Sequence, residues 1–132
     1  MYHAPDKATQ ALALLNKALA IYGRVYGRDD KHWGQGFVHL LKGQIYATEG
    51  KKEEALASYL RSEHIYTTVL THEAIDDVSR LYAALVRLGL QTQDQKMVQL
   101  YTQEHIRVFG HDHPRTLEIV SEADAQGIKI SL

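Results

Sequence analysis

Apolar residues recur at steps of three and four along most of this chain, which is the spacing that gathers them on one face of an α-helix. In the first such stretch they are Ala8, Ala11, Leu12, Leu15, Ala18, Leu19, Tyr22, Val25 and Tyr26. The pattern predicts helices at about Pro5–Tyr26, Trp33–Thr48, Lys52–Leu70, Ala74–Leu88, Thr92–Phe109 and from Pro114 onward. No segment alternates as an internal strand would, so we expect an all-α fold of about six helices.

Prolines and glycines separate these stretches. Proline is favoured in the first turn of a helix, where its missing N–H is not needed, so Pro5 and Pro114 predict helix starts. Gly27, Gly89 and Gly110 each follow the last apolar residues of a stretch and predict helix ends.

Side chains able to accept a hydrogen bond from a backbone N–H precede three of the helices. Thr71 can cap the fourth helix, Thr92 with Gln95 fits a capping box before the fifth, and Asp112 can cap the sixth. The tail Ile128–Leu132 is too short to form a sheet alone, and we expect it to fold back onto the last helix.

The composition is that of a globular protein and excludes several kinds of chemistry. With 15 Lys and Arg against 16 Asp and Glu, the 132 residues carry a formal net charge of -1, whereas nucleic-acid binders and polybasic membrane sensors need an excess of positive charge. The absence of cysteine excludes disulfides, thiolate metal sites and cysteine nucleophiles. No apolar run is long enough to span a membrane, and the N-terminus lacks the pattern of a signal peptide. We therefore expect a cytoplasmic protein that binds neither nucleic acid nor membrane.

The sequence also repeats itself at an offset of about 41 residues. Glu63-His64-Ile65 recurs as Glu104-His105-Ile106, and Leu40 and Leu81 match at the same offset. A fixed period of this length, filled by two helices, is typical of an α-solenoid, in which antiparallel helix pairs stack because none can bury its apolar face alone.

Three segments resemble the tetratricopeptide repeat (TPR) family, in particular the long-repeat variety of the kinesin light chains. They are residues 11–21, the segment Gly50–Ala55 leading to Tyr59 and Ser62, and Phe109-Gly110-His111-Asp112-His113-Pro114. The resemblance implies a single TPR-like superhelical domain over residues 1–132. Residues 5–27 would form the second helix of a partial repeat, 33–70 and 74–109 two full repeats, 114–126 a terminal helix, and 127–132 a tail.

Solenoid geometry predicts a concave groove lined by the first helix of each pair. Two registers are open: one follows Gly50 and Ala55, and the other, which we prefer, follows the apolar stripes and spares Lys42 from burial. In the preferred register the candidate peptide-binding residues are His39, Lys42, Tyr46, Asp76, Ser79, Arg80 and Arg87, together with Gln35, Val38 and Ala83. Trp33 is either a further anchor for a partner or a plug over the junction of the first two helices.

The sequence contains no convincing catalytic or cofactor site. Neither a Gly-rich phosphate loop nor a Gly-x-Ser-x-Gly elbow occurs. His111 and His113 lack a third neighbouring ligand, so we expect no metal there and interpret the segment as an inter-repeat loop. His64 and His105 occupy matching places in the repeat and are interpreted as packing residues, with a pH-sensing or metal-binding role as the alternative.

These patterns predict a non-catalytic protein-interaction module without cofactors. The cations near the groove favour an acidic peptide segment, which is also what the resemblance to kinesin light chains implies, since those repeats bind acidic peptides with an aromatic residue. The alternatives are a self-associating domain that forms a homodimer through its half-repeat ends, and a fragment of a larger sensor protein.

Overall fold

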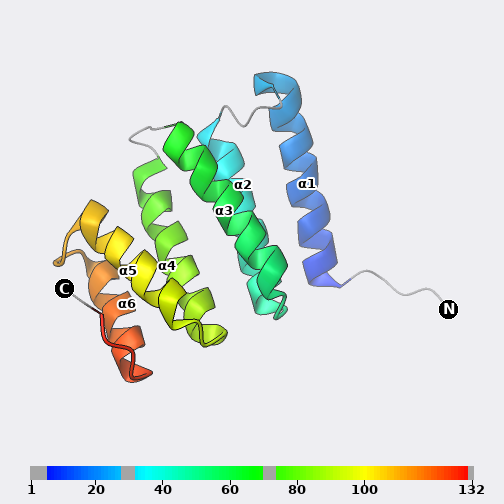
Figure 1. Ribbon diagram of the computed structural model, residues 1–132. Helices are drawn as coiled ribbons and strands as arrows, with labels where there is room; N and C mark the ends of the chain where they lie inside the picture. The colour runs from blue at the N-terminus through cyan, green and yellow to red at the C-terminus, as the bar shows by residue number, and fades with distance from the viewer. Residues whose placement is uncertain (1–5, 28–31, 70–73, 131–132) are drawn as a thin grey trace. The chain divides into compact units, whose positions relative to one another are not determined.

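The computed structural model describes residues 6–27, 32–69 and 74–130. Over these ranges the chain is all-helical and contains no strand (Figure 1). The helices are α1 (Lys7–Tyr26), α2 (Trp33–Thr48), α3 (Lys52–Thr68), α4 (Ile75–Gln91), α5 (Gln95–Phe109) and α6 (Pro114–Ala125). The all-α prediction is therefore confirmed, and none of the described helices has the length and apolar character needed to cross a membrane.

The chain forms two compact units, one within residues 1–72 and the other within residues 73–132. The N-terminal unit contains α1, α2 and α3, and the C-terminal unit contains α4, α5 and α6. Within the units, α2 packs closely against α3 and α4 against α5, each as an antiparallel pair joined by a short turn (Figure 1). Such pairs agree with an all-α helical-repeat arrangement.

The helix ends follow the expected chemistry, although not always at the expected residues. Asp6 caps α1 by accepting a hydrogen bond from the Thr9 N–H at 2.7 Å. The predicted capping box on Thr92 is wrong: α5 is capped by Asp94, which accepts from the Met97 N–H at 3.1 Å. Thr92 instead ends α4. The predicted cap Thr71 lies outside the described residues.

Glycines let α2 and α3 approach closely in the N-terminal unit. A Cβ on Gly43 would meet the ring of Tyr59, and one on Gly36 would meet the ring of Tyr66 at 3.1 Å. The hydroxyl of Ser62 donates to the Gly36 carbonyl across the same interface at 2.7 Å. By contrast, no residue of α1 is fully buried, so α1 is the least covered helix of this unit.

The buried positions repeat at 43 residues rather than 41. Ala55, Ser58, Tyr59 and Ser62 are buried in α3, and so are Val98, Tyr101, Thr102 and His105 in α5. The turns match at the same offset: the Lys51 N–H donates to the Tyr46 carbonyl, and the Asp94 N–H to the Gly89 carbonyl. The recurrence of Glu-His-Ile at 41 residues is therefore not structural, and His64 is exposed whereas His105 is buried.

Gly89 does not end α4, contrary to the prediction. The helix continues to Gln91, because Gly89 is a buried contact point where a Cβ would lie 2.8 Å from a methyl of Val98 on α5. At the other end of the C-terminal unit, Ile128 is buried and its N–H donates to the Ala123 carbonyl at 3.0 Å. This bond closes the end of α6, and the described part of the tail also contacts α5, since the Gln99 side chain donates to the Lys129 carbonyl at 3.3 Å.

Candidate functional site

Three of the predicted groove residues, His39, Lys42 and Tyr46, lie on α2 and are half-buried. Gln35 and Val38, which were expected on the same open face, are buried. The prediction that they are open is wrong because it followed the stripe of large apolar residues on α2. In the structure α3 packs against the side of α2 that carries the glycines, so that small residues define the buried face. Only part of the expected face of α2 is open.

The predicted groove residues of α4 are either buried or paired. Ser79 is fully buried, so its assignment to an open groove is wrong, and the same holds for the buried Ala83. Arg80 lies 3.1 Å from Asp76, and its charge is therefore balanced on its own helix. Asp76 also accepts a hydrogen bond from Arg115 of α6 at 3.2 Å.

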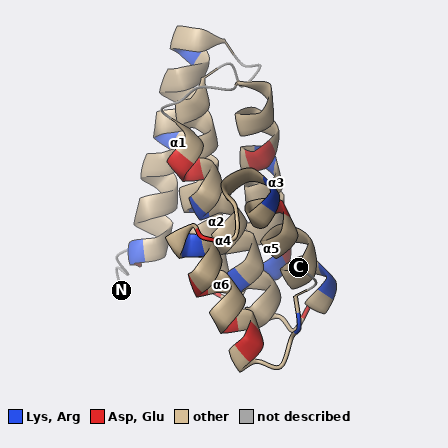
Figure 2. Cartoon of the chain, turned by 90° about the vertical axis from the view of Figure 1, so that its left-hand side faces the viewer, with Lys and Arg blue, Asp and Glu red and all other residues tan. Residues whose placement is uncertain are grey.

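Arg87 is likewise committed to partners within its own unit. Its Nε and a terminal N–H donate to the two carboxylate oxygens of Glu122 at 3.0 and 3.1 Å, and Glu118 lies 3.6 Å away. Donation of these hydrogen bonds to Glu122 holds the pKa of the Arg87 guanidinium above its ordinary value. Arg87 and Glu122 line a hollow of about 460 Å³, and Figure 2 shows acidic as well as basic residues on α6. This surface of α4 is not the basic one that we predicted.

Trp33 lies at the start of α2 in a row of stacked rings. Its ring centroid is 5.3 Å from that of His32, and His32 stacks on Tyr26 at 4.4 Å and on Tyr22 at 5.4 Å. The same His32 caps α2, since its Nδ1 accepts from the Gly34 N–H at 2.9 Å. Trp33 thus lies next to the ring cluster in which His32 contacts Tyr22 and Tyr26 of α1.

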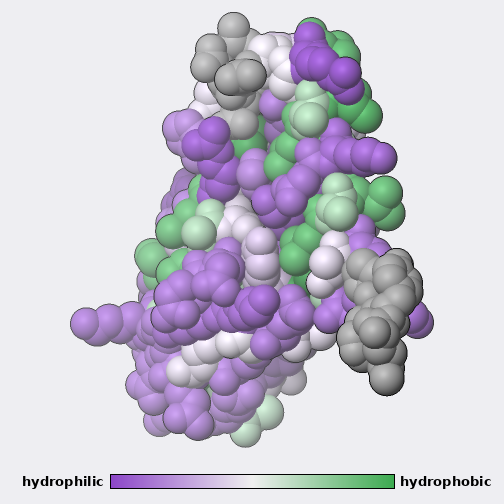
Figure 3. All heavy atoms as spheres, turned by 90° about the vertical axis from the view of Figure 1, so that its right-hand side faces the viewer, coloured by the Kyte–Doolittle hydropathy of each residue, from purple (hydrophilic) through white to green (hydrophobic). Residues whose placement is uncertain are grey.

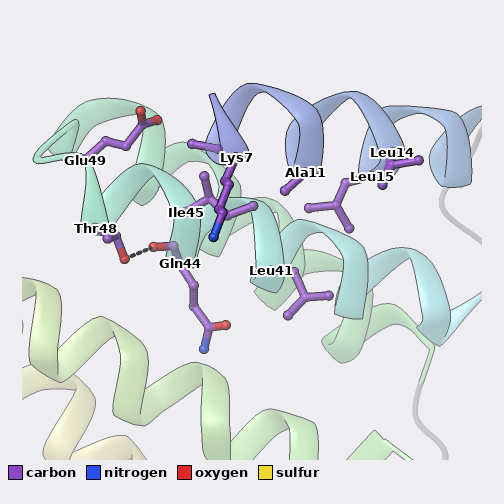
Figure 4. Close-up of a pocket in the computed structure, with 10 residues that line it drawn as sticks. Lys7, Ala11, Leu14, Leu15, Leu41, Gln44, Ile45, Thr48 and Glu49 are labelled. Atoms are coloured by element: carbon purple, nitrogen blue, oxygen red, sulfur yellow. Dashed lines mark hydrogen bonds between the residues drawn. The ribbon is translucent and has the colours of Figure 1, made fainter. Parts of the chain in front are cut away.

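An apolar hollow of about 560 Å³ lies between α1 and α2 (Figure 4). We call it the α1–α2 trough, and it is lined by Lys7, Ala8, Ala11, Leu14, Leu15, Leu41, Gln44, Ile45, Thr48 and Glu49. Ala11 and Leu15 face Leu41 and Ile45 across it (Figure 4). Figure 3 shows apolar side chains reaching the surface on the face that carries α1. The trough therefore offers an open apolar floor within the N-terminal unit.

The polar residues of the α1–α2 trough lie at one end and are partly committed to one another. The hydroxyl of Thr48 donates to the Gln44 carbonyl at 2.9 Å, and Glu49 lies 3.8 Å from Lys51. Lys7 and Glu49 are the charged residues of the lining. A surface of this kind binds by burying apolar groups, with its few polar groups fixing orientation. The apolar stripe predicted for the first helix contains Ala8, Ala11 and Leu15 of this lining and was expected to be covered by packing, so the sequence pattern did not indicate an open surface here.

A second cluster of polar side chains is buried among α4, α5 and α6. An Arg115 N–H donates to the Ser79 hydroxyl oxygen at 2.8 Å, and that hydroxyl lies 2.7 Å from Nε2 of His105. Nδ1 of His105 lies 2.6 Å from the Thr116 hydroxyl, which donates to the Gly110 carbonyl at 2.8 Å. Because the Thr116 proton is used there, its oxygen accepts from Nδ1–H, and Nε2 accepts the Ser79 proton.

This buried cluster pairs a serine with a histidine, as a nucleophile is paired with its base, but a substrate cannot reach the pair. A serine whose hydroxyl donates to a histidine is the arrangement used in nucleophilic catalysis, yet Ser79 and His105 are both fully buried. Burial, together with the charges of His113 and Arg115, lowers the pKa of His105 to about 4. The neutral imidazole thus serves to tie the three helices together, as a packing residue.

The segment around His113 begins α6 rather than forming a ligand cluster. His113, not the predicted Asp112, caps the helix, because its Nδ1 accepts from the Arg115 N–H at 3.0 Å, and Pro114 occupies the first turn as predicted. The ring centroids of His113 and His105 lie 5.2 Å apart, with the two rings in an edge-on arrangement. Among the residues that the structure describes, no three His, Asp or Glu side chains are grouped as metal ligands would be.

Comparison of this chain with family models, with curated proteins and with solved structures finds no match. The resemblance to tetratricopeptide repeats therefore depends on the sequence segments alone, and function is argued below from the surface of the molecule.

Proposed function

We propose that this chain is a non-catalytic protein-interaction module and that its N-terminal unit binds a segment of a partner along the α1–α2 trough. The observation that carries the proposal is that α1, although rich in apolar residues, has none that is fully buried, while Leu14 is 67 % exposed. An uncovered apolar surface of this kind beside a hollow is typical of interaction sites. The predicted groove on α4 does not support binding, because its cations are paired.

The resemblance to tetratricopeptide repeats gives the proposal further support, because members of that family bind peptides. The α1–α2 trough is not the groove that the resemblance implies. We therefore assign the same class of function, peptide binding, to a different surface of the molecule. A cavity volume of about 560 Å³ lies within the range of about 300–1,000 Å³ common for binding pockets, which is enough for two or three apolar side chains of a partner.

A paired-variant capture experiment tests this proposal. Leu14→Asp places a charge at the edge of the trough, and Leu117→Asp makes the same change on α6, where Leu117 is 59 % exposed. A partner captured by the wild-type chain is mapped to a peptide, and the peptide is titrated against all three proteins. We expect Leu14→Asp to weaken binding by about tenfold or more, because the free energy of burying one leucine side chain corresponds to at least that change in affinity. Leu117→Asp should leave the affinity unchanged. Equal affinities for the two variants would reject the trough as the binding site.

Self-association is the second candidate, because exposed apolar side chains on α1 could also pair with those of another copy. Leu14, Ile21 and Val25 are 67 %, 52 % and 65 % exposed. Sedimentation at two protein concentrations distinguishes the cases: a dimer that is lost in Leu14→Asp supports self-association, and a monomer at both concentrations rejects it.

A further inference from the structure

An apolar stripe runs along the outer face of α1 and continues into the α1–α2 trough. Leu14, Ile21 and Val25 follow one another at steps of seven and four, which places them on one side of the helix. Leu14 belongs both to this stripe and to the lining of the trough. The stripe and the trough therefore form one continuous apolar surface, which we call the α1 face.

The charged residues that α1 itself contributes to this surface all have the same sign, whereas Glu49, which follows α2, lies at one end of the trough. Lys7, Lys17 and Arg24 are the charged residues of α1, which contains no Asp or Glu. Lys17 follows Leu14 by three residues and Arg24 follows Ile21 by three, so each cation neighbours an apolar residue of the stripe on the helix surface.

None of these three cations forms a salt bridge with a described residue, whereas Arg87 and Arg107 of the C-terminal unit are held by glutamates at 3.0 and 2.8 Å. The α1 face is consequently apolar along its centre and positively charged along the edge that α1 contributes.

This charge pattern selects among the occupants that an apolar face can take. A second copy of the chain paired through α1 would bring cations against cations, and like charges in contact are destabilising. A segment that carries acidic side chains beside its own apolar stripe satisfies both parts of the face. Charge complementarity of this kind provides specificity and fast association, while the buried apolar residues provide affinity.

The backbone of α1 determines the form of that segment. All of its central N–H and C=O groups are used within the helix, so recognition must go through side chains rather than through addition of a strand. A helix of 20 residues is about 30 Å long and presents its stripe at helical spacing, which a second helix can match with residues at i, i+3, i+4 and i+7. We propose that the α1 face binds an acidic amphipathic helix of a partner protein; this inference rests on the proposed function.

Designed peptides test the proposal with the full chain. The probe is a synthetic amphipathic peptide of about 20 residues with leucines on one face and glutamates beside them, and its control has lysines in place of the glutamates. Fluorescence anisotropy is expected to show the acidic peptide binding at least about tenfold more tightly than the basic one at low salt, and losing most of that preference at about 0.5 M NaCl, where the screening length is only a few ångströms. Vesicles of phosphatidylcholine with phosphatidylserine are titrated in parallel.

Charge reversal on the protein gives the second measurement. Lys17→Glu with Arg24→Glu is expected to abolish the preference for the acidic peptide or to invert it, while Lys96→Glu on α5 leaves it unchanged. Both Lys17 and Lys96 are exposed, so circular dichroism should show unaltered helicity for these variants.

Each other outcome overturns the inference in a recognisable way. Equal binding of the two peptides would show an apolar face without charge selection, which rejects the acidic partner and leaves the proposed interaction function standing. Binding of the vesicles with no binding of either peptide would assign the α1 face to a lipid surface. Binding of neither peptide, together with a failure of the Leu14→Asp capture experiment, would reject the inference and the proposed function alike.

Discussion

Acidification is expected to destabilise the C-terminal unit through His105. Its imidazole is fully buried, and burial, with the nearby charges of His113 and Arg115, lowers its pKa to about 4. In the unfolded chain the pKa of a histidine is about 6.5. Between these two values the unfolded chain binds the proton more readily than the folded chain does. The stability contributed by the neutral ring is therefore fully present above about pH 6.5 and is lost as the pH falls toward about 4.

The size of this loss follows from the pKa difference and the hydrogen bonds. At about 1.4 kcal/mol for each unit of pKa, a decrease from about 6.5 to about 4 gives at most about 3 kcal/mol. We expect about 2 kcal/mol, because local rearrangement lets water solvate a protonated ring. A proton on Nε2 would point at the Ser79 oxygen, which already accepts from Arg115 at 2.8 Å, so the folded state gains no new acceptor on protonation.

Urea denaturation followed by far-UV circular dichroism at about pH 7.5 and about pH 4.5 measures the effect. The matched variant is His105→Gln, whose side chain can accept from Ser79 and donate to Thr116 but does not titrate. His111→Gln alters an exposed histidine and is the control. Carboxylates that titrate in the same range are common to all three proteins, so they cancel in the comparison. The wild type and His111→Gln should lose about 2 kcal/mol more than His105→Gln on acidification; equal losses in all three would refute the reasoning.

Three further predictions concern packing and backbone, and urea denaturation at neutral pH measures them all. Gly43→Ala places a methyl against the ring of Tyr59 and should lower the free energy of unfolding by about 1–3 kcal/mol. Its control is Gly23→Ala, which has no atom within 4 Å of the added methyl and should raise the free energy of unfolding by up to about 1 kcal/mol. Equal effects of the two substitutions would contradict the close contact at Gly43. Gln93 has a φ of 58°, so Gln93→Gly should stabilise the chain by up to about 1 kcal/mol, and a loss would mean that its side chain matters more than its backbone. Thr102→Val should stabilise by about 1 kcal/mol, because the buried hydroxyl has no hydrogen-bond partner among the described residues; a loss would reveal a partner.

The existence and order of the helices could be predicted from the sequence because they depend on local chemistry. Hydrophobic periodicity located all six described helices, and Gly27 and Gly110 end theirs with φ values of 93° and 88°, as glycine after the last turn predicts. Gly89 shows the limit of the same rule. A glycine can end a helix, or it can let a neighbouring helix pack closely against it. At Gly89 the contact with Val98 of the next helix shows that the second role applies, and the residues next to Gly89 in the sequence do not reveal this contact.

The register of the repeat could not be predicted from hydrophobicity, because much of the buried surface is made of small or polar residues. Gly36, Ser58 and Ser62 are buried in the N-terminal unit and Ser79 in the C-terminal unit. A stripe drawn through the large apolar residues passes beside these positions and shifts the inferred groove by one or two residues. The shared tripeptide Glu-His-Ile then gave an offset of 41 that the buried positions do not follow.

A signal for the correct register was nevertheless present in the spacing of small and polar residues. Gly36 and Ser62 are 26 residues apart and hydrogen-bonded, and Ser79 and His105 are also 26 residues apart and hydrogen-bonded. The same contact point between paired helices is thus filled by a glycine and a serine in one unit and by a serine and a histidine in the other. The first pair contains no titratable group, whereas the second contains a buried imidazole. Sensitivity to acid through this contact point therefore belongs to the C-terminal unit alone, although both units use the same repeat position.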